Sequence, residues 1–304
     1  MCYLKTGYFK FEVYQLVFAN SLYKYYNLNI KEKFLLLLNI YFCLRRELMR
    51  IILFEILGID IKSYGLMIAI GIITASMLFI NKGIKKNYDE DSLLNLIIFA
   101  VIGGILGGKT LFIITEFKNI VTNPNILLNF GYGFVVYGAI AGGALAMYLY
   151  CRHKKWRLLK MLDMAVPGLA IAQGFGRIGC FLAGCCYGAP TDFLFGVVFP
   201  KDSLAPSGVH LHPTQIYSSI FDFLLGIFLL YYSKKHRKDG KILGMYLIVY
   251  SIGRFLVEFL RNDPRGSVGV LSTSQFIAIF TLVLGIAVFK AGSFFKGANK
   301  YSEK

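Results

Sequence analysis

The sequence predicts an all-α, polytopic integral membrane protein, a helical bundle of about seven transmembrane helices. Hydrophobic residues make up 56% of the 304 residues and charged residues only 16%, whereas about a quarter of a soluble globular chain is charged. Apolar stretches long enough to cross a bilayer recur along the chain. The basic residues gather in the short stretches between them, as is typical of membrane proteins.

The apolar stretches give the predicted elements in chain order. They lie near residues 64–80, 93–115, 132–151, 162–175, 215–232, 243–260 and 272–289. The fourth stretch contains Pro167 and several glycines. We expect these residues to interrupt the helix. They are tolerated in a bilayer where neighbouring helices satisfy the freed backbone groups.

The basic residues predict the orientation. They follow the first, third and fifth spans and return in the C-terminal tail: Lys82, Lys85 and Lys86; Arg152, Lys154, Lys155, Arg157 and Lys160; Lys234, Lys235, Arg237, Lys238 and Lys241; Lys290, Lys296, Lys300 and Lys304. In a seven-span topology these stretches share one side, which is then cytoplasmic. The net charge of +16 therefore indicates topology and contacts with anionic lipids rather than nucleic-acid binding.

Three segments are expected: an N-terminal extension (1–48), a seven-span membrane domain (49–290) and a basic cytoplasmic tail (291–304). The extension does not fit the topology, because its basic residues favour the inside and its apolar run, 34–44, is too short to span. Either translation begins at Met49 and the upstream segment is a mis-called start, or the segment is amphipathic and lies on the membrane surface.

Two glycine-rich patterns imitate nucleotide-binding motifs. Residues 103–110 match the P-loop and residues 174–179 match the dinucleotide fingerprint, but neither has the strand and helix that such a motif requires. In the first pattern, glycines four residues apart (Gly103 with Gly107, Gly104 with Gly108) instead predict close helix packing. In the second, we expect the glycines to allow close backbone approach at a helix break.

Several charged residues lie within or beside the predicted spans, where charge is costly and normally functional. Arg254 and Glu258 are four residues apart and can pair along one helix face, either as a buried ion pair that only fixes packing or as part of a site. Lys109, Arg177 and Arg261 fall on the same predicted outer side. Such an excess of cations complements a phosphate headgroup, which arginine binds with two parallel hydrogen bonds.

Six cysteines show no spacing typical of a disulfide scaffold. Three of them, Cys180, Cys185 and Cys186, lie close together in the sequence. They can be inert small apolar residues, a redox pair or nucleophilic thiol whose pKa Arg177 lowers, or a zinc site completed by a histidine. Their spacing is not a standard zinc pattern, so no metal or other cofactor is expected.

Five ordered motifs carry a family resemblance: 64–67, 107–109, 176–179, 212–217 and 250–261. From about Met49 to Phe289 the chain resembles the bacterial prolipoprotein diacylglyceryl transferases. The resemblance implies a seven-span inner-membrane enzyme whose site faces outward. Its substrates would be phosphatidylglycerol and the lipobox cysteine of a prolipoprotein signal peptide, with glycerol phosphate released. Its other expected partners are membrane lipids, and no nucleic acid is expected.

The resemblance also implies site residues. Arg177 matches the phospholipid-binding arginine of the family signature, and the other substrate-binding candidates are Arg254, Arg261, Lys109, Tyr64, Tyr217 and Cys185. This chain departs from the family signature, because two asparagines are absent and Cys185 replaces the glutamate. A family histidine is replaced by Tyr137, a poor base at neutral pH. The catalytic candidates are therefore His212 or His210 as the base, with Tyr137 and Glu258.

Two alternatives remain at this stage. The chain can be a related membrane lipid transferase with another acceptor, in which Cys185 or Cys186 carries a transient group. It can also be a non-catalytic lipid-binding paralogue. The sequence shows no inverted pair of broken helices, which argues against a transporter.

Overall fold

A computed structural model describes residues 51–294 except 57–58, 124–132, 194, 202, 236 and 264–265. Seven long helices are present in this part of the chain: α3 (Ser63–Ile84), α4 (Glu90–Thr115), α6 (Val136–His153), α7 (Leu158–Ala183), α8 (Thr214–Tyr232), α9 (Lys241–Glu258) and α10 (Thr273–Phe294). They occupy the seven predicted positions. The predicted extension and most of the predicted tail lie outside the described residues.

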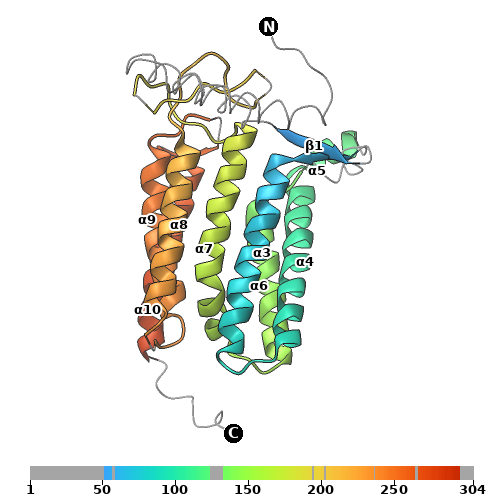
Figure 1. Cartoon of the computed structure of the whole chain (residues 1–304), viewed down its shortest axis with the longest axis vertical. Coiled ribbons are helices and arrows are strands. Elements are labelled where there is room, and N and C mark those ends of the chain that lie inside the picture. Colours follow the sequence, from blue (N-terminus) through green and yellow to red (C-terminus); the bar gives the residue numbers. More distant parts are fainter. Residues whose placement is uncertain are drawn as a thin grey trace, which may run out of the picture. The chain divides into compact units, whose positions relative to one another are not determined.

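Short elements accompany the helices, and Figure 1 shows two of them, β1 and α5, at one end of the bundle. They are the short helix α5 (Phe117–Thr122) and two antiparallel hairpins, β1 (Ile52–Ile56) with β2 (Ile59–Lys62) and β3 (Ser267–Val268) with β4 (Leu271–Ser272). Neither hairpin was predicted from the sequence.

Helix α7 is the hub of the packing. It contacts α3 on one side and α8 and α9 on the other, while α4 packs mainly on α6 and α10 mainly on α9. Figure 1 shows α7 between the pair α8 and α9 and the group α3, α4 and α6. Residues of α7 are therefore the ones that the rest of the bundle encloses most completely.

The packing of α4 on α6 confirms the small-residue prediction for one of the two glycine pairs. A Cβ at Gly103 or Gly107 would collide with the backbone of Gly142 or Gly138 on α6. At Gly104 a Cβ would meet only ordinary contact, and at Gly108 it would meet the ring of Phe134. The P-loop pattern thus lies wholly within a helix and contributes a packing surface.

The prediction of an interrupted fourth span near 162–175 is wrong. Helix α7 is continuous from Leu158 to Ala183 with Pro167 inside it, so the second glycine pattern lies on a helix and not at a break. Two glycines of the pattern still permit close approach, since a Cβ at Gly174 would lie 2.9 Å from Phe223 on α8 and one at Gly179 would lie 3.2 Å from the Cα of Tyr64 on α3, whereas a Cβ at Gly176 would meet nothing within 4 Å. Beside Pro167, a Cβ at Gly168 would lie 3.0 Å from the backbone of Ala75 on α3. Neighbouring helices thus support the turns around the proline.

The basic turns share one end of the bundle. Lys154 donates to Ser92 Oγ at 3.1 Å and joins the end of α6 to the start of α4. Arg157 pairs with Asp239 at 2.8 Å, and Lys241 Nζ donates to the carbonyl of Phe289 at 2.6 Å. These contacts connect the turns α6–α7 and α8–α9 and the end of α10, as the topology prediction requires.

By length and composition, five helices of the described residues can cross a membrane: α3, α4, α7, α8 and α10. Helix α6 ends in Arg152 and His153, and α9 contains Lys241, Arg254 and Glu258, which makes both less apolar. The protein is a multi-pass helical membrane protein, and the count of seven spans stays a prediction.

Candidate functional site

A pocket opens among α7, α8 and α9, toward the end of the bundle opposite the basic turns. It is lined by Arg177, Ser218, Phe221, Asp222, Tyr250, Gly253, Arg254 and Val257. Two of the predicted site residues, Arg177 and Arg254, therefore face the same space from different helices. Arginine within a membrane bundle normally faces such an interior space.

Arg254 is held by an ordered network. Its Nη1 atom lies 2.7 Å from Oε2 of Glu258 one turn later, and its Nη2 atom donates to Ser274 Oγ at 2.8 Å. Glu258 is buried and also accepts a hydrogen bond from Ser272 Oγ at 2.6 Å. This confirms the predicted pairing, and it fixes the direction of the Arg254 guanidinium.

Arg177 is in a different situation. It projects from α7 six residues before the end of the helix. Its guanidinium makes no hydrogen bond or ion pair to the residues that the structure describes. The nearby groups that act on it electrostatically include Tyr250 and Asp222. A partly buried guanidinium with its fork of five N–H donors open is prepared to bind an anion.

Asp222 was not among the site residues predicted from the sequence. This residue lies at the middle of α8, is 2% exposed, and interacts electrostatically with both Arg177 and Arg254. The signal was available, because a single acidic residue inside an apolar span is costly and usually functional. The pocket is thus lined by two arginines and one carboxylate, and Glu258 adds a second carboxylate behind Arg254.

Arg261 lies just beyond the end of α9 and is not open to a ligand in the way Arg177 is. It forms a two-pronged ion pair with Asp263, with Nε–Oδ1 and Nη2–Oδ2 distances of 3.0 and 2.8 Å. This side-chain contact raises the pKa of Arg261 against the opposing effect of burial. Its backbone bridges to Gly188, and the N–H of Gly188 donates to the carbonyl of His212 at 3.0 Å.

The two histidines have different environments. His212 is partly buried, and its Nδ1 atom lies 3.3 Å from the hydroxyl of Tyr217. The same residue is anchored through its backbone N–H to Ala189 at 3.0 Å. His210 is exposed. Of the two candidates, His212 is therefore the one whose imidazole has a described hydrogen-bond partner. Gly188 lies between the backbones of His212 and Arg261.

The remaining candidates are Tyr137, Tyr64 and Lys109. Tyr137, at the start of α6, is close enough to Arg254, Glu258 and Arg177 to interact with their charges. Tyr64, at the start of α3, packs beside Gly179 on α7. Lys109 lies on α4, which packs mainly on α6, and it is not among the residues that line the pocket.

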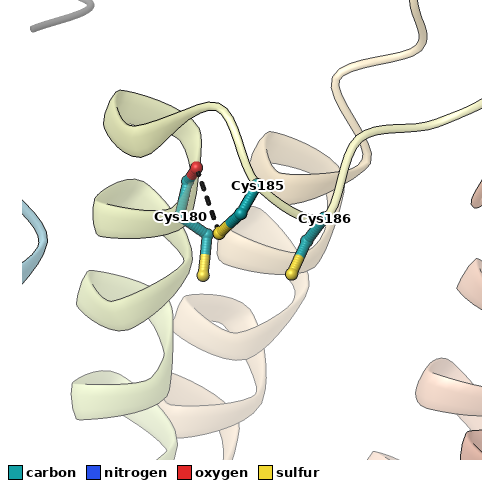
Figure 2. A group of neighbouring side chains, drawn as sticks. All are labelled: Cys180, Cys185 and Cys186. Carbon is teal, nitrogen blue, oxygen red and sulfur yellow. Dashed lines mark hydrogen bonds between the residues drawn. The ribbon is translucent and has the colours of Figure 1, made fainter. Parts of the chain in front are cut away.

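The fourth span was predicted to end near residue 175, which would put Arg177 and Cys180 in the segment after it; this is wrong, because both are on α7. Cys180 nevertheless meets Cys185 and Cys186, and the three sulfur atoms lie within 4.8 Å of one another (Figure 2). The Cys180 and Cys185 thiols, as hydrogen-bond donors, lower the pKa of Cys186, and the charges of Arg261 and Arg177 lower it further. The thiol contacts also raise the pKa of Cys185.

Comparisons with known proteins agree on one family. The model of the family described as prolipoprotein diacylglyceryl transferase matches residues 51–291. A phosphatidylglycerol–prolipoprotein diacylglyceryl transferase of Clostridium tetani is 58% identical over 82% of this chain and all of its own length. One of Clostridium perfringens is 58% identical over 84% of this chain and all of its own length. One of Clostridioides difficile is 33% identical over 77% of this chain and 91% of its own.

Proposed function

The chain belongs to the prolipoprotein diacylglyceryl transferase family, and on that premise we propose that it transfers a diacylglyceryl group from phosphatidylglycerol to a prolipoprotein. The acceptor is the thiol of a lipobox cysteine in the signal peptide. The enzyme acts in the bacterial cytoplasmic membrane with its pocket toward the outer face, since the basic turns occupy the other end.

The reaction has simple requirements. The cysteine sulfur forms a bond to the glyceryl carbon while the bond from that carbon to the phosphate oxygen breaks. The electron pair leaves on glycerol phosphate, and the thiol proton must pass to a base. Catalysis therefore needs stabilisation of the phosphate leaving group and a thiolate acceptor.

The observation that carries the proposal is the open guanidinium of Arg177 in a pocket that it shares with Arg254. Two arginine side chains in one pocket can bind a phosphodiester and stabilise the negative charge that develops as the ester oxygen departs. Glu258 and Ser274 hold Arg254 in place. The buried Asp222 interacts electrostatically with both arginines.

His212 is the base in this proposal. Its Nδ1 atom is next to the Tyr217 hydroxyl, a contact that orients the ring and leaves Nε2 for the acceptor thiol. The backbones of His212 and Arg261 both pair with Gly188, which lies between them, near the outer end of the pocket helices. Tyr137 and Tyr64 then border the lipid or the acceptor, and Lys109 adds positive potential from α4.

The test is complementation of a cell depleted of its own diacylglyceryl transferase. Expression of this chain should restore growth, and mass spectrometry of a lipoprotein should show a diacylglyceryl thioether on its N-terminal cysteine. An Arg177→Ala variant that is inserted normally should not restore growth. If the wild-type chain is inserted and the lipoprotein stays unmodified, the assignment of acceptor is wrong and the alternative of another acceptor gains support.

A further inference from the structure

The end of helix α7 brings two cysteines together by its backbone geometry alone. Gly184 adopts φ +73° and its N–H donates to the carbonyl of Phe181 at 3.1 Å, while the N–H of Cys185 donates to the carbonyl of Cys180 at 3.1 Å. This paired pattern is a common helix-ending motif in which the residues at its two ends pack against each other. Those two residues here are Cys180 and Cys185.

Cys186 joins them through an uncommon conformation. Its φ is +63°, a region that costs an ordinary L-residue ~1–2 kcal/mol. Buried polar side chains hold it there, because Thr214 Oγ1 donates to the carbonyl of Cys186 at 2.8 Å and Gln215 Nε2 donates to the carbonyl of Cys185 at 2.7 Å. Local strain that is fixed by its surroundings is typical of ligand-binding positions.

The result is three convergent thiols. Cys180 is buried, Cys185 and Cys186 are partly buried, and their sulfur atoms all lie within 4.8 Å of one another. Figure 2 shows the three side chains approaching one another from the end of α7 and the segment after it. Thiolates that share a zinc ion at about 2.3 Å stand about 3.8 Å apart, so small rotations of the side chains would complete the site.

From this convergence we propose that Cys180, Cys185 and Cys186 bind one thiophilic metal cation, Zn(II) or Cu(I), beside the lipid pocket. Soft thiolate ligands select these cations. Each thiol that binds releases its proton to solvent. The complex is anionic, with one net negative charge for Zn(II) and two for Cu(I), and Arg261 and Arg177 lie close enough to interact with Cys186 electrostatically and to balance that charge.

The proposal is independent of the transfer reaction. The bound metal would fasten the segment after α7 to the helix. Arg177 lies three residues before Cys180, on the neighbouring turn of the same helix. Three protein ligands leave a fourth position of Zn(II) for a water molecule, whereas they suit three-coordinate Cu(I) without an addition.

The experiment uses the full chain, reduced with a thiol-free reductant and purified in detergent without metal. Zn(II) and Cu(I) are added separately, excess is removed by gel filtration, and bound metal is measured by elemental analysis. We expect one ion per chain with at least one of the two metals. A variant with all three cysteines changed to serine should retain none, and the Cys151→Ser variant should match wild type. Cys151 is the control because it is also buried but lies at the end of α6.

A second measurement uses the wild-type chain alone and does not depend on the folding of a variant. The bound metal should protect Cys180, Cys185 and Cys186 from alkylation, as read by peptide mass spectrometry, and leave the alkylation of Cys151 unchanged. The ion that protects at the lower free concentration identifies the preferred metal. Equal retention by wild type and the triple variant, or alkylation of the three cysteines that neither metal changes, would overturn the proposal.

Discussion

At the scale of single residues, the two arginines of the pocket differ in their hydrogen-bond partners. Arg254 is already bound to Glu258 and Ser274, whereas the fork of Arg177 is open among the described residues. The position of Arg254 therefore depends on its neighbours, whereas Arg177 is the arginine available to form two parallel hydrogen bonds with a phosphate group.

Arg177→Lys should reduce transfer strongly, although it keeps the charge, because lysine cannot donate two parallel hydrogen bonds. A charge-assisted hydrogen bond contributes ~1.5–3 kcal/mol, so we expect a loss of about 10- to 100-fold in kcat/KM. The measurement is transfer to a lipobox peptide in detergent. Arg152→Lys, an exposed change at the other end of the bundle, should leave the rate unchanged, and full activity of Arg177→Lys would remove Arg177 from the donor site.

His212→Asn should lower the rate by about 10²- to 10⁴-fold, the usual contribution of a general base. His210→Asn should have little effect, because that side chain is exposed. Tyr217→Phe should cost several-fold, since it removes one hydrogen bond to the His212 ring worth ~1 kcal/mol. Inserted His212→Asn protein with wild-type rates would refute the histidine base, and Tyr137→Phe would then be the variant to measure.

At the scale of elements, glycine spacing decides which helices touch. Gly107→Ala should destabilise the protein by ~1–3 kcal/mol, because the added Cβ would collide with the backbone of Gly138. Gly104→Ala is the matched control, since a Cβ there would lie 3.5 Å from the carbonyl oxygen of Ala139. Thermal unfolding in detergent compares the two. Equal melting temperatures would contradict the packing of α4 on α6.

Helix α9 begins on a carboxylate supplied by α7. Asp163 is buried and accepts hydrogen bonds at 2.8 Å from the N–H groups of Gly240 and Leu243. Asp163→Ala should therefore cost ~1–3 kcal/mol of stability. Asp239→Ala, which breaks the more exposed ion pair to Arg157, should cost less than ~1 kcal/mol. A larger loss for Asp239→Ala than for Asp163→Ala would be inconsistent with this cap.

Apolar length was sufficient to predict the seven long helices of the described residues. Small-residue spacing predicted close helix packing at Gly103 and Gly107, but not that α6 is the partner. The continuity of α7 could not be predicted, because the neighbours around Pro167 lie on helices distant in sequence. A Cβ at Gly226 of α8 would lie 3.2 Å from the carbonyl oxygen of Pro167, and Ala75 of α3 packs against the adjacent Gly168. The convergence of Cys180 with Cys185 depends on the conformation of Gly184, which the sequence permits without specifying. Asp222 was predictable and was missed.

At the scale of the whole molecule, the basic turns and the pocket lie at opposite ends of the helices. Reporter fusions after Trp156 and Lys238 should therefore report the cytoplasm, and a fusion after Ser207 should report the outside, because positive loops are retained on the cytoplasmic side. An outside signal at Lys238 would contradict the seven-span topology. A fusion after Tyr88, in the turn between α3 and α4, is an internal check and should agree with Trp156.

The contact between α3 and α7 has a consequence for biosynthesis. Gly71 on α3 packs against Ala172 of α7, and Gly168 of α7 packs against Ala75, yet α4 and α6 are made between these two helices. At about 5–20 residues per second, a nascent α3 waits several seconds in the bilayer before its main partner is translated. During that interval quality-control proteases meet an unassembled helix. Substitutions on this surface should therefore lower the amount of protein recovered while the surviving molecules keep their specific activity.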